Sequence, residues 1–200
     1  MNHGNIEFRK VSGFKRGTLF ELLSDAYSFD GRWEDCCGAD WKEFDDFFFD
    51  NPQIADRYGF ITVLNGKAAG LASWDPRKMP EYVEIGHNCI ITSCKGHGYG
   101  RMQLREALQR IVKRGAKRII VTTNGRSVPA RRMYEGAGFK VCGKRRNESH
   151  TAFFGDFFYV LRVKLCYNQE NLADVHSDRI IFFRMSTEQQ PKTFSTSLSG

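Results

Sequence analysis

Apolar positions recur every three or four residues in four parts of the chain, and this spacing predicts amphipathic helices. The first of them carries Leu19, Leu22 and Leu23 on one face. Ser127 is a candidate N-terminal cap for the fourth, because its side chain can accept a hydrogen bond from a free backbone N–H. The four predicted helices span residues 18–28, 41–50, 101–114 and 127–136.

Seven further segments alternate apolar and polar residues or form short apolar runs, which predicts strands. Asn65-Gly66 between two of them is a hairpin signal, and residues 30–40 are predicted to be a loop. The predicted strands span residues 7–12, 59–64, 67–74, 82–92, 118–123, 139–144 and 157–164. The order β-α-α-β-β-β-α-β-α-β-β indicates an α/β protein with a mixed sheet of about seven strands and helices on both faces.

A chain of 200 residues suits one domain, which we place at residues 1–165. The remaining residues, 166–200, are a polar C-terminal extension in which residues 180–185 are a candidate strand and the end is expected to be disordered. The hydrophobic share of 41% and the aromatic share of 14% exclude an intrinsically disordered chain.

Membrane and secretory signals are absent from the pattern. The longest strictly apolar run has five residues, whereas a membrane-spanning helix needs about 20, and the first thirty residues mix charges throughout. We therefore expect a cytoplasmic protein with its six cysteines reduced. The cysteines form no CxxC pair and lack histidines at zinc-binding spacing, so we expect no metal site.

Charge is sorted along the chain. Residues 30–56 contain nine acidic and two basic side chains, a net charge of −7, whereas residues 95–146 contain fifteen basic and two acidic ones, a net charge of +13. The basic segment favours an anionic ligand and the acidic one a cationic ligand.

A glycine-rich loop, residues 95–101, lies inside the basic segment between a predicted strand and a predicted helix. Gly96, Gly98 and Gly100 let the backbone approach a ligand, and the helix start that follows favours a phosphate. The loop lacks the Gly-Lys-Ser/Thr of a nucleotide-binding P-loop. It also lacks the third glycine of a dinucleotide fingerprint, because Gln103 stands there.

Two motifs resemble the GNAT superfamily of N-acetyltransferases. Lys95, Gly98 and Gly100 match its Arg/Gln-x-x-Gly-x-Gly/Ala loop, with lysine in place of the usual arginine or glutamine. Residues 130–139, which include Tyr134, match its Ala-x-x-x-Tyr-x-x-x-Gly-Phe signature. The asparagine usual seven residues before that tyrosine is Ser127 here.

The resemblance implies a GNAT fold over residues 5–165, in which the strands at 82–92 and 118–123 run parallel and splay apart around acetyl-CoA. It implies that the loop amides hold the pyrophosphate and that the backbone of Asn88, Cys89 and Ile90 meets the pantetheine and acetyl group. The cofactor-binding residues expected from it are Asn88, Cys89, Ile90, Lys95, Gly96, His97, Gly98, Tyr99, Gly100, Arg101, Ser127 and Ala130.

Acetyl transfer to an amine by direct attack needs a neutral amine and a protonated leaving thiolate. Strand alternation puts Glu84 on one face with Gly86, Asn88 and Ile90 and puts His87 on the other. The resemblance suggests Glu84 as the general base, with a water chain as the alternative, and Tyr134 as the general acid. A covalent cysteine mechanism is not expected, since neither Cys89 nor Cys94 has a base partner in view.

The acceptor wall in this fold is formed by the first two helices and the loop between them, which here is the acidic, aromatic segment. Trp33, Glu34, Asp35 and Trp41 are the candidate acceptor-binding residues, and acids with aromatics suit a small cationic amine. The alternatives are a peptide or protein amine, an acyl-CoA-binding protein without turnover, and a nucleic-acid-binding module. We expect no nucleic-acid or membrane partner, and a homodimer is left open.

Overall fold

The computed structural model describes residues 5–125, 127–146 and 157–164. A single seven-stranded sheet has the strand order β1-β2-β3-β4-β5-β7-β6. The elements in chain order are β1 (Ile6–Arg9), the 3-10 helix η1 (Val11–Gly13), α1 (Thr18–Tyr27), α2 (Arg32–Asp50), α3 (Pro52–Tyr58), β2 (Gly59–Leu64), β3 (Lys67–Asp75), β4 (Val83–Ile90), the 3-10 helix η2 (Thr92–Cys94), α4 (Tyr99–Val112), β5 (Arg118–Asn124), α5 (Val128–Glu135), β6 (Lys140–Arg146) and β7 (Phe157–Lys164). The candidate strand at 180–185, the rest of the C-terminal extension and residues 147–156 lie outside the described residues.

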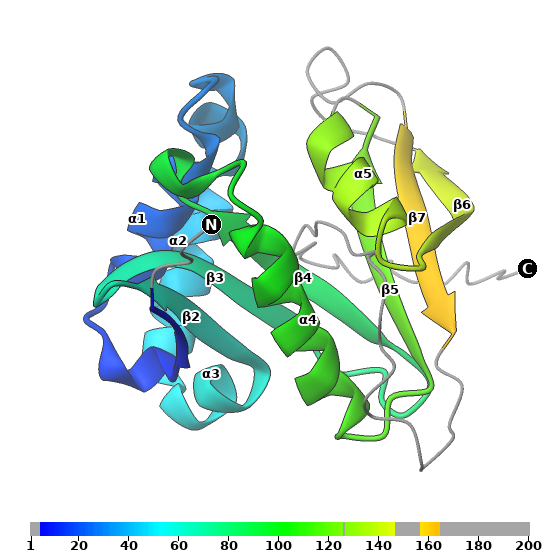
Figure 1. Ribbon diagram of the computed structural model, residues 1–200, viewed down its shortest axis with the longest axis horizontal. Helices are drawn as coiled ribbons and strands as arrows, with labels where there is room; N and C mark the ends of the chain where they lie inside the picture. Colours follow the sequence, from blue (N-terminus) through cyan, green and yellow to red (C-terminus); the bar gives the residue numbers. More distant parts are fainter. Residues whose placement is uncertain (1–4, 126, 147–156, 165–200) are drawn as a thin grey trace, which may run out of the picture.

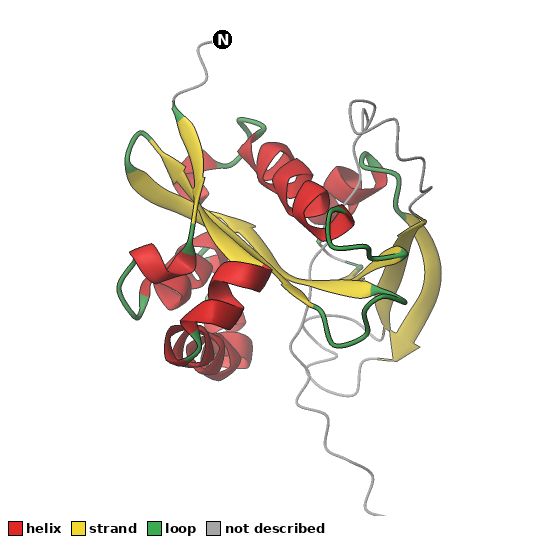
Figure 2. Ribbon diagram, turned by 90° about the horizontal axis from the view of Figure 1, so that it is seen from below, coloured by secondary structure: helices red, strands yellow, loops and turns green. Residues whose placement is uncertain are grey.

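Helices cover both faces of the sheet, as predicted (Figures 1 and 2). The first three helices pack on one face around Leu23, Phe44 and Ile61, and α4 and α5 pack on the other around Ile85, Ile111 and Tyr134. An apolar core therefore lies on each face of the sheet. Strands that are buried on both faces have runs of apolar residues in the sequence.

The predicted loop at residues 30–40 is wrong, because α2 already begins at Arg32. Trp33 and Cys37 extend the stripe of Trp41, Phe44 and Phe48 by two helical steps and pack against the same core. The sequence analysis also missed α3, a short helix whose first residue is the proline that ends α2.

The hairpin between β2 and β3 is confirmed. Asn65 and Gly66 both have positive φ, 48° and 80°, which is the conformation of the type I′ turn that asparagine-glycine favours. The turn fixes the register of the two strands, with Leu64 opposite Lys67.

Strands β4 and β5 are parallel neighbours that pair only at their starts, through Val83 with Ile119 and Glu84 with Ile120. Beyond these pairs the two strands diverge toward their carboxyl ends (Figure 1). The expected splayed pair is thus present, and Glu84 lies at the point where the strands separate.

A β-bulge in β4 overturns the predicted strand faces. Asn88 pairs with Ala72 but Ile85 pairs with Trp74, so two residues of β4 oppose the single Ser73 of β3. The extra residue reverses the alternation. His87 therefore packs against Phe44 of α2, with the ring centroids 4.4 Å apart and the rings tilted by 50°. Asn88 turns to α4 on the opposite face of the sheet and does not share the face of Glu84.

Buried His87 makes stability depend on pH. Burial lowers the pKa of His87 from 6.5 to about 4, so between these values the unfolded chain binds a proton that the folded chain does not. We expect about 3 kcal/mol of unfolding free energy to be lost as pH falls from 6.5 to 4. Urea titrations at several pH values should show this loss disappear in His87→Phe and persist in His97→Gln, which changes an exposed histidine. An unaltered pH slope in His87→Phe contradicts the assignment.

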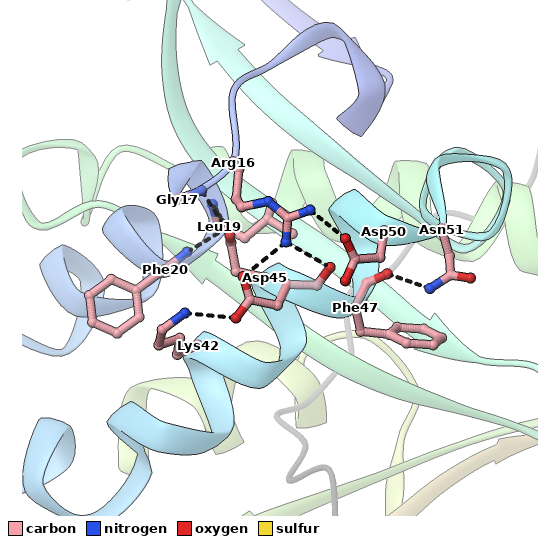
Figure 3. A network of polar contacts seen from close by, with 10 residues as sticks. Arg16, Gly17, Leu19, Phe20, Lys42, Asp45, Phe47, Asp50 and Asn51 are labelled. Atoms are coloured by element: carbon pink, nitrogen blue, oxygen red, sulfur yellow. Dashed lines mark hydrogen bonds and ion pairs between the residues drawn. The ribbon is translucent and has the colours of Figure 1, made fainter.

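The acidic segment has a structural task that the charge pattern did not predict. Asp45 of α2 is 2% exposed and accepts hydrogen bonds from the backbone N–H groups of Gly17, Leu19 and Phe20 at 2.7, 2.9 and 3.3 Å. It therefore caps the N-terminus of α1 from another helix, as Figure 3 shows. Arg16 in the same network pairs with Asp50 and Asp46, so these carboxylates are not free to bind a substrate cation.

Loss of this cap should be felt in stability. We expect Asp45→Ala to lower the unfolding free energy by about 2–3 kcal/mol, because three backbone donors lose a buried charged acceptor. Glu43→Ala, an exposed change on the same helix, should stay within about 0.5 kcal/mol of wild type. Denaturant unfolding of both variants makes the comparison, and equal effects would contradict the capping role.

Candidate functional site

A cavity of about 990 Å³ opens where the carboxyl ends of β4 and β5 diverge. Ligands of open α/β sheets commonly bind at this position. Its walls come from α1, α2, β4, the glycine loop, β5 and α5. The lining residues are Ala26, Tyr27, Phe29, Asp30, Arg32, Trp33, Asn88, Cys89, Ile90, Thr92, Cys94, Lys95, Gly96, Gly98, Gly100, Arg101, Asn124, Ser127, Pro129, Ala130, Arg132 and Met133.

The glycine loop presents backbone donors to this cavity. Gly96 and Gly98 have φ of 81° and 84°, a conformation that other residues rarely adopt. Gly98 precedes the first turn of α4, where no side chain caps the helix and no acidic residue stands. The free N–H groups and the positive end of the helix dipole suit a phosphate group.

Four basic residues, Arg32, Lys95, Arg101 and Arg132, line the cavity against one acidic residue, Asp30. Asp30 is already paired with Arg32 at 2.5 Å. The cavity is therefore suited to an anionic ligand, in agreement with the charge of the basic segment.

Lys95 links the glycine loop to α1 at the wall of the cavity. Its ammonium donates to the carbonyl oxygen of Ala26 near the end of α1 and lies 5.1 Å from the centroid of the Phe29 ring. Partial burial lowers the pKa of Lys95. A lysine at this position thus ties the loop to α1, in addition to lining the cavity.

The candidate cap residue Ser127 makes a different contact from the predicted one. Its side chain caps no backbone group of α5. Instead its hydroxyl and backbone nitrogen both donate to Asn124 Oδ1, at 3.2 and 3.0 Å. Asn124 at the end of β5 lines the cavity beside Ser127, so the usual asparagine of the motif is displaced by three positions but still reaches the cavity.

Tyr134 is fully buried and lies behind the cavity lining, at 0% exposure. Burial raises the pKa of its phenol well above the usual value, and the neighbouring Asn88 side chain opposes this rise. The hydroxyl therefore keeps its proton throughout the ordinary pH range, which suits a donor but not a base.

Glu84 is held across the narrow end of the splayed strands. Its carboxylate accepts a hydrogen bond of 3.0 Å from Thr122 of β5 and lies 3.6 Å from the guanidinium of Arg145 of β6. Burial raises the pKa of Glu84, while Arg145 and Thr122 act in the opposite direction. A carboxylate with a raised pKa is a better base, but Glu84 is not part of the cavity lining.

The α1–α2 end of the cavity is aromatic. Tyr27 lies 4.5 Å from Trp33 and 6.4 Å from Phe29 between ring centroids, and all three rings line the cavity. Of the residues predicted to bind the acceptor, Trp33 lies here. Glu34 and Asp35 are exposed and do not line the cavity, and Trp41 is 4% exposed in the core.

Most of the residues expected to bind the cofactor meet at this cavity, with two exceptions. His97 and Tyr99 are absent from the lining, and their rings stack on one another at 6.2 Å. The sequence analysis missed Tyr27, Phe29, Asp30 and Gln103. Gln103 had a signal, because it is a polar residue on the apolar stripe of α4 that continues through Leu104, Ala107 and Leu108.

Nowhere in the described residues do three or more potential metal ligands gather into one group. None of the helices they form is long and apolar enough to cross a membrane.

Comparisons with known proteins agree with this geometry. The model of the acetyltransferase (GNAT) family matches residues 17–139, more than half of the chain. No curated protein sequence matches.

Solved structures share the fold at low sequence identity. A GNAT-family acetyltransferase from Desulfovibrio desulfuricans superposes with a TM-score of 0.62 at 18% identity, covering 80% of this chain and 98% of its own. A GNAT-family acetyltransferase from Elizabethkingia anophelis with acetyl-CoA bound superposes with a TM-score of 0.59 at 16% sequence identity. The match covers 82% of this chain and 100% of that one. The ribosomal-protein-S18-alanine N-acetyltransferase of Escherichia coli superposes with a TM-score of 0.62 at 19% sequence identity. The match covers 84% of this chain and 98% of that one.

Proposed function

Since the chain belongs to the GNAT family of acetyltransferases, whose members use acetyl-CoA, we propose that it passes the acetyl group directly to a primary amine bound in the same cavity. The observation that carries the proposal is the continuity of the cavity. One cavity is lined by the glycine loop and four basic side chains, by the end of β4, and by Tyr27, Phe29 and Trp33. Acetyl-CoA and an acceptor can therefore meet without a covalent enzyme intermediate.

The residues present fit acetyl-CoA. Gly96 and Gly98 offer backbone donors for a pyrophosphate, Arg101 and Arg132 offer positive charge, and the buried side-chain amide of Asn88 lines the cavity beside the Tyr134 hydroxyl. When bound, acetyl-CoA would supply the activated acetyl group. The chain would orient it and handle the protons.

Proton transfer falls to Glu84 and Tyr134. An alkyl amine with a pKa near 10.4 is neutral in roughly one molecule in 2,500 at pH 7, so a base lowers the barrier. Glu84 lies at the narrow end of the gap between β4 and β5 and outside the cavity lining, so it takes this role through a water chain. Tyr134 provides the proton for the leaving sulfur.

We propose a small cationic amine as the acceptor. The ring of Trp33 can hold a cation against its face, whereas Phe29 already has the Lys95 ammonium 5.1 Å from its centroid and Tyr27 packs against Trp33 and Trp41. The support from Glu34 and Asp35 that the charge pattern predicted is missing from the lining, so the Trp33 ring is what this assignment depends on.

The first test is thermal unfolding with acetyl-CoA, CoA, ATP and NAD, followed by release of free thiol with a panel of polyamines, aminoglycosides and N-terminal peptides. A ligand at about 100 times its Kd adds roughly 2.7 kcal/mol of stability. Stabilisation by acetyl-CoA and CoA, with turnover of polyamines or aminoglycosides, is the expected result. Turnover of peptides alone makes the acceptor a protein amine. Binding without turnover leaves an acyl-CoA-binding protein, and salt-sensitive nucleic-acid binding without CoA binding rejects the proposal.

Trp33 provides a variant that isolates the acceptor. We expect Trp33→Ala to raise KM for the amine about tenfold, because the ring that holds the cation is lost, and to leave CoA affinity nearly unchanged. Phe47→Ala is the matched control, since Phe47 is an exposed aromatic on the same helix, outside the lining. Equal KM values for both variants would place the acceptor elsewhere.

A further inference from the structure

Gln103 is a fully buried polar residue on the apolar side of α4, and its contacts fix the orientation of its amide. Nε2 donates to the carbonyl oxygens of Leu71 at 2.9 Å and Cys89 at 3.2 Å, and to Asn88 Oδ1 at 2.5 Å. Oε1 accepts a hydrogen bond of 2.6 Å from the Thr62 hydroxyl. The reversed amide would set an oxygen against three oxygens, so only this orientation is stable.

The same network fixes Asn88. Its Oδ1 is held by Gln103, which leaves Nδ2 as the remaining polar atom of this side chain and a donor. Asn88 is 3% exposed and lines the cavity. Nδ2 is buried beside the Tyr134 hydroxyl, yet completes no hydrogen bond of normal length and angle with any described residue. A buried donor without a partner of normal geometry needs an explanation, and among the buried atoms in this state Asn88 Nδ2 belongs to a residue that lines the cavity.

We propose that Asn88 is a catalytic residue whose Nδ2–H donates to the thioester carbonyl oxygen, and that Gln103 and Thr62 are positioning residues that hold its amide in that orientation. The inference rests on the proposed function, since the carbonyl belongs to acetyl-CoA. It adds a side-chain donor to the backbone contacts expected at the end of β4.

The step balances with residues already described. Asn88 meets the negative charge that grows on the carbonyl oxygen as the amine nitrogen bonds to the carbonyl carbon. Glu84 takes the proton that makes the amine neutral before attack, and the second proton, which the nitrogen loses as it becomes an amide, returns to Tyr134 after that phenol has protonated the sulfur. Tyr134 gives its proton to the sulfur as the carbon–sulfur bond breaks and the sulfur keeps the bonding pair. A preorganised donor at such an oxygen commonly accelerates acyl transfer by about 10²–10³-fold.

Binding of CoA and acetyl-CoA by calorimetry tests the contact without turnover, because CoA lacks the carbonyl group. We expect Asn88→Ala to weaken acetyl-CoA about three- to tenfold relative to CoA and to lower kcat about a hundredfold. If both ligands are weakened equally, Asn88 contacts the pantetheine that they share. If neither kcat nor the ratio of the acetyl-CoA and CoA affinities changes, Asn88 has no catalytic role. Either result overturns the inference.

The positioning residues have their own test, which also serves if Asn88→Ala fails to fold. Thr62→Val keeps the shape of the buried side chain but removes the donor to Gln103, whereas Thr62→Ser keeps it. We expect Thr62→Val to lower kcat about tenfold with KM for the amine unchanged and to shift the acetyl-CoA to CoA ratio, and Thr62→Ser to restore both. If Thr62→Val and Thr62→Ser have the same kcat and the same ratio of acetyl-CoA to CoA affinity, the positioning role is wrong. A wild-type protein that binds neither CoA species refutes the proposed function instead.

Discussion

Replacing Tyr134 by phenylalanine is expected to lower kcat about a hundredfold to a thousandfold while acetyl-CoA affinity stays within about threefold. The phenol is fully buried beside Asn88, and its proton is the one placed for the departing sulfur. Phenylalanine fills the same space, so the core between α4, α5 and β5 should survive. Steady-state kinetics with thiol detection, together with calorimetric binding of acetyl-CoA, separates the two quantities.

Two comparisons make the Tyr134 result specific. Tyr82→Phe, a partly buried tyrosine outside the cavity lining, should keep wild-type kcat. An acetyl thioester of an aromatic thiol has a more acidic leaving group that needs no proton, so the loss in Tyr134→Phe should shrink with this donor. A loss of equal size with both donors would show that Tyr134 is needed for packing and not for protonation.

Glu84→Gln is expected to lower kcat/KM at pH 7 about a hundredfold, by removal of the base. The sign of the pH dependence follows from its environment. Glu84 accepts a proton only when ionised, so the rate of the wild type should fall as pH drops through its pKa. Burial raises that pKa, which places the acid limb above the range of an ordinary carboxyl. Rate profiles of kcat/KM between pH 5 and 9 should show the limb in wild type and not in Glu84→Gln.

Arg145 provides a second test of whether Glu84 is the base. Arg145 lies 3.6 Å from the Glu84 carboxylate and lowers its pKa, so Arg145→Met should move the acid limb to higher pH. Glu81→Gln, an exposed change just before β4, should leave the profile unchanged. A profile that does not respond to Glu84→Gln would assign the base to another residue or to a water chain without Glu84.

Local patterns carried much of the prediction, because their physical causes are local. The type I′ turn at Asn65 and Gly66 and the positive φ of Gly96 and Gly98 depend on the conformational freedom of those residues. The apolar stripes of α1 and α4 likewise follow from helical spacing alone. Ten of the twelve cofactor-binding residues expected from the family resemblance line the cavity, among them Asn88 and Ala130.

Contacts between segments far apart in the chain were beyond the reach of these patterns. The bulge opposite Ser73 exists only because β3 and β4 pair with one extra residue, and it alone puts Asn88 and Glu84 on opposite faces. Asp45 caps a helix that begins 27 residues earlier in the chain. Sequence patterns do not show this contact, so Asp45 was grouped with the acidic segment that favours a cationic ligand.

Residue type and short spacing were enough to predict the order of the strands and most helices, the glycine loop and the family. Tertiary structure alone decided which side chains meet: the aromatic wall of Tyr27, Phe29 and Trp33, and the chain of Thr62, Gln103 and Asn88. Buried polar groups find partners wherever the fold brings donors and acceptors together. Their direction, and hence the donor offered to a ligand, is fixed only when all partners are in place.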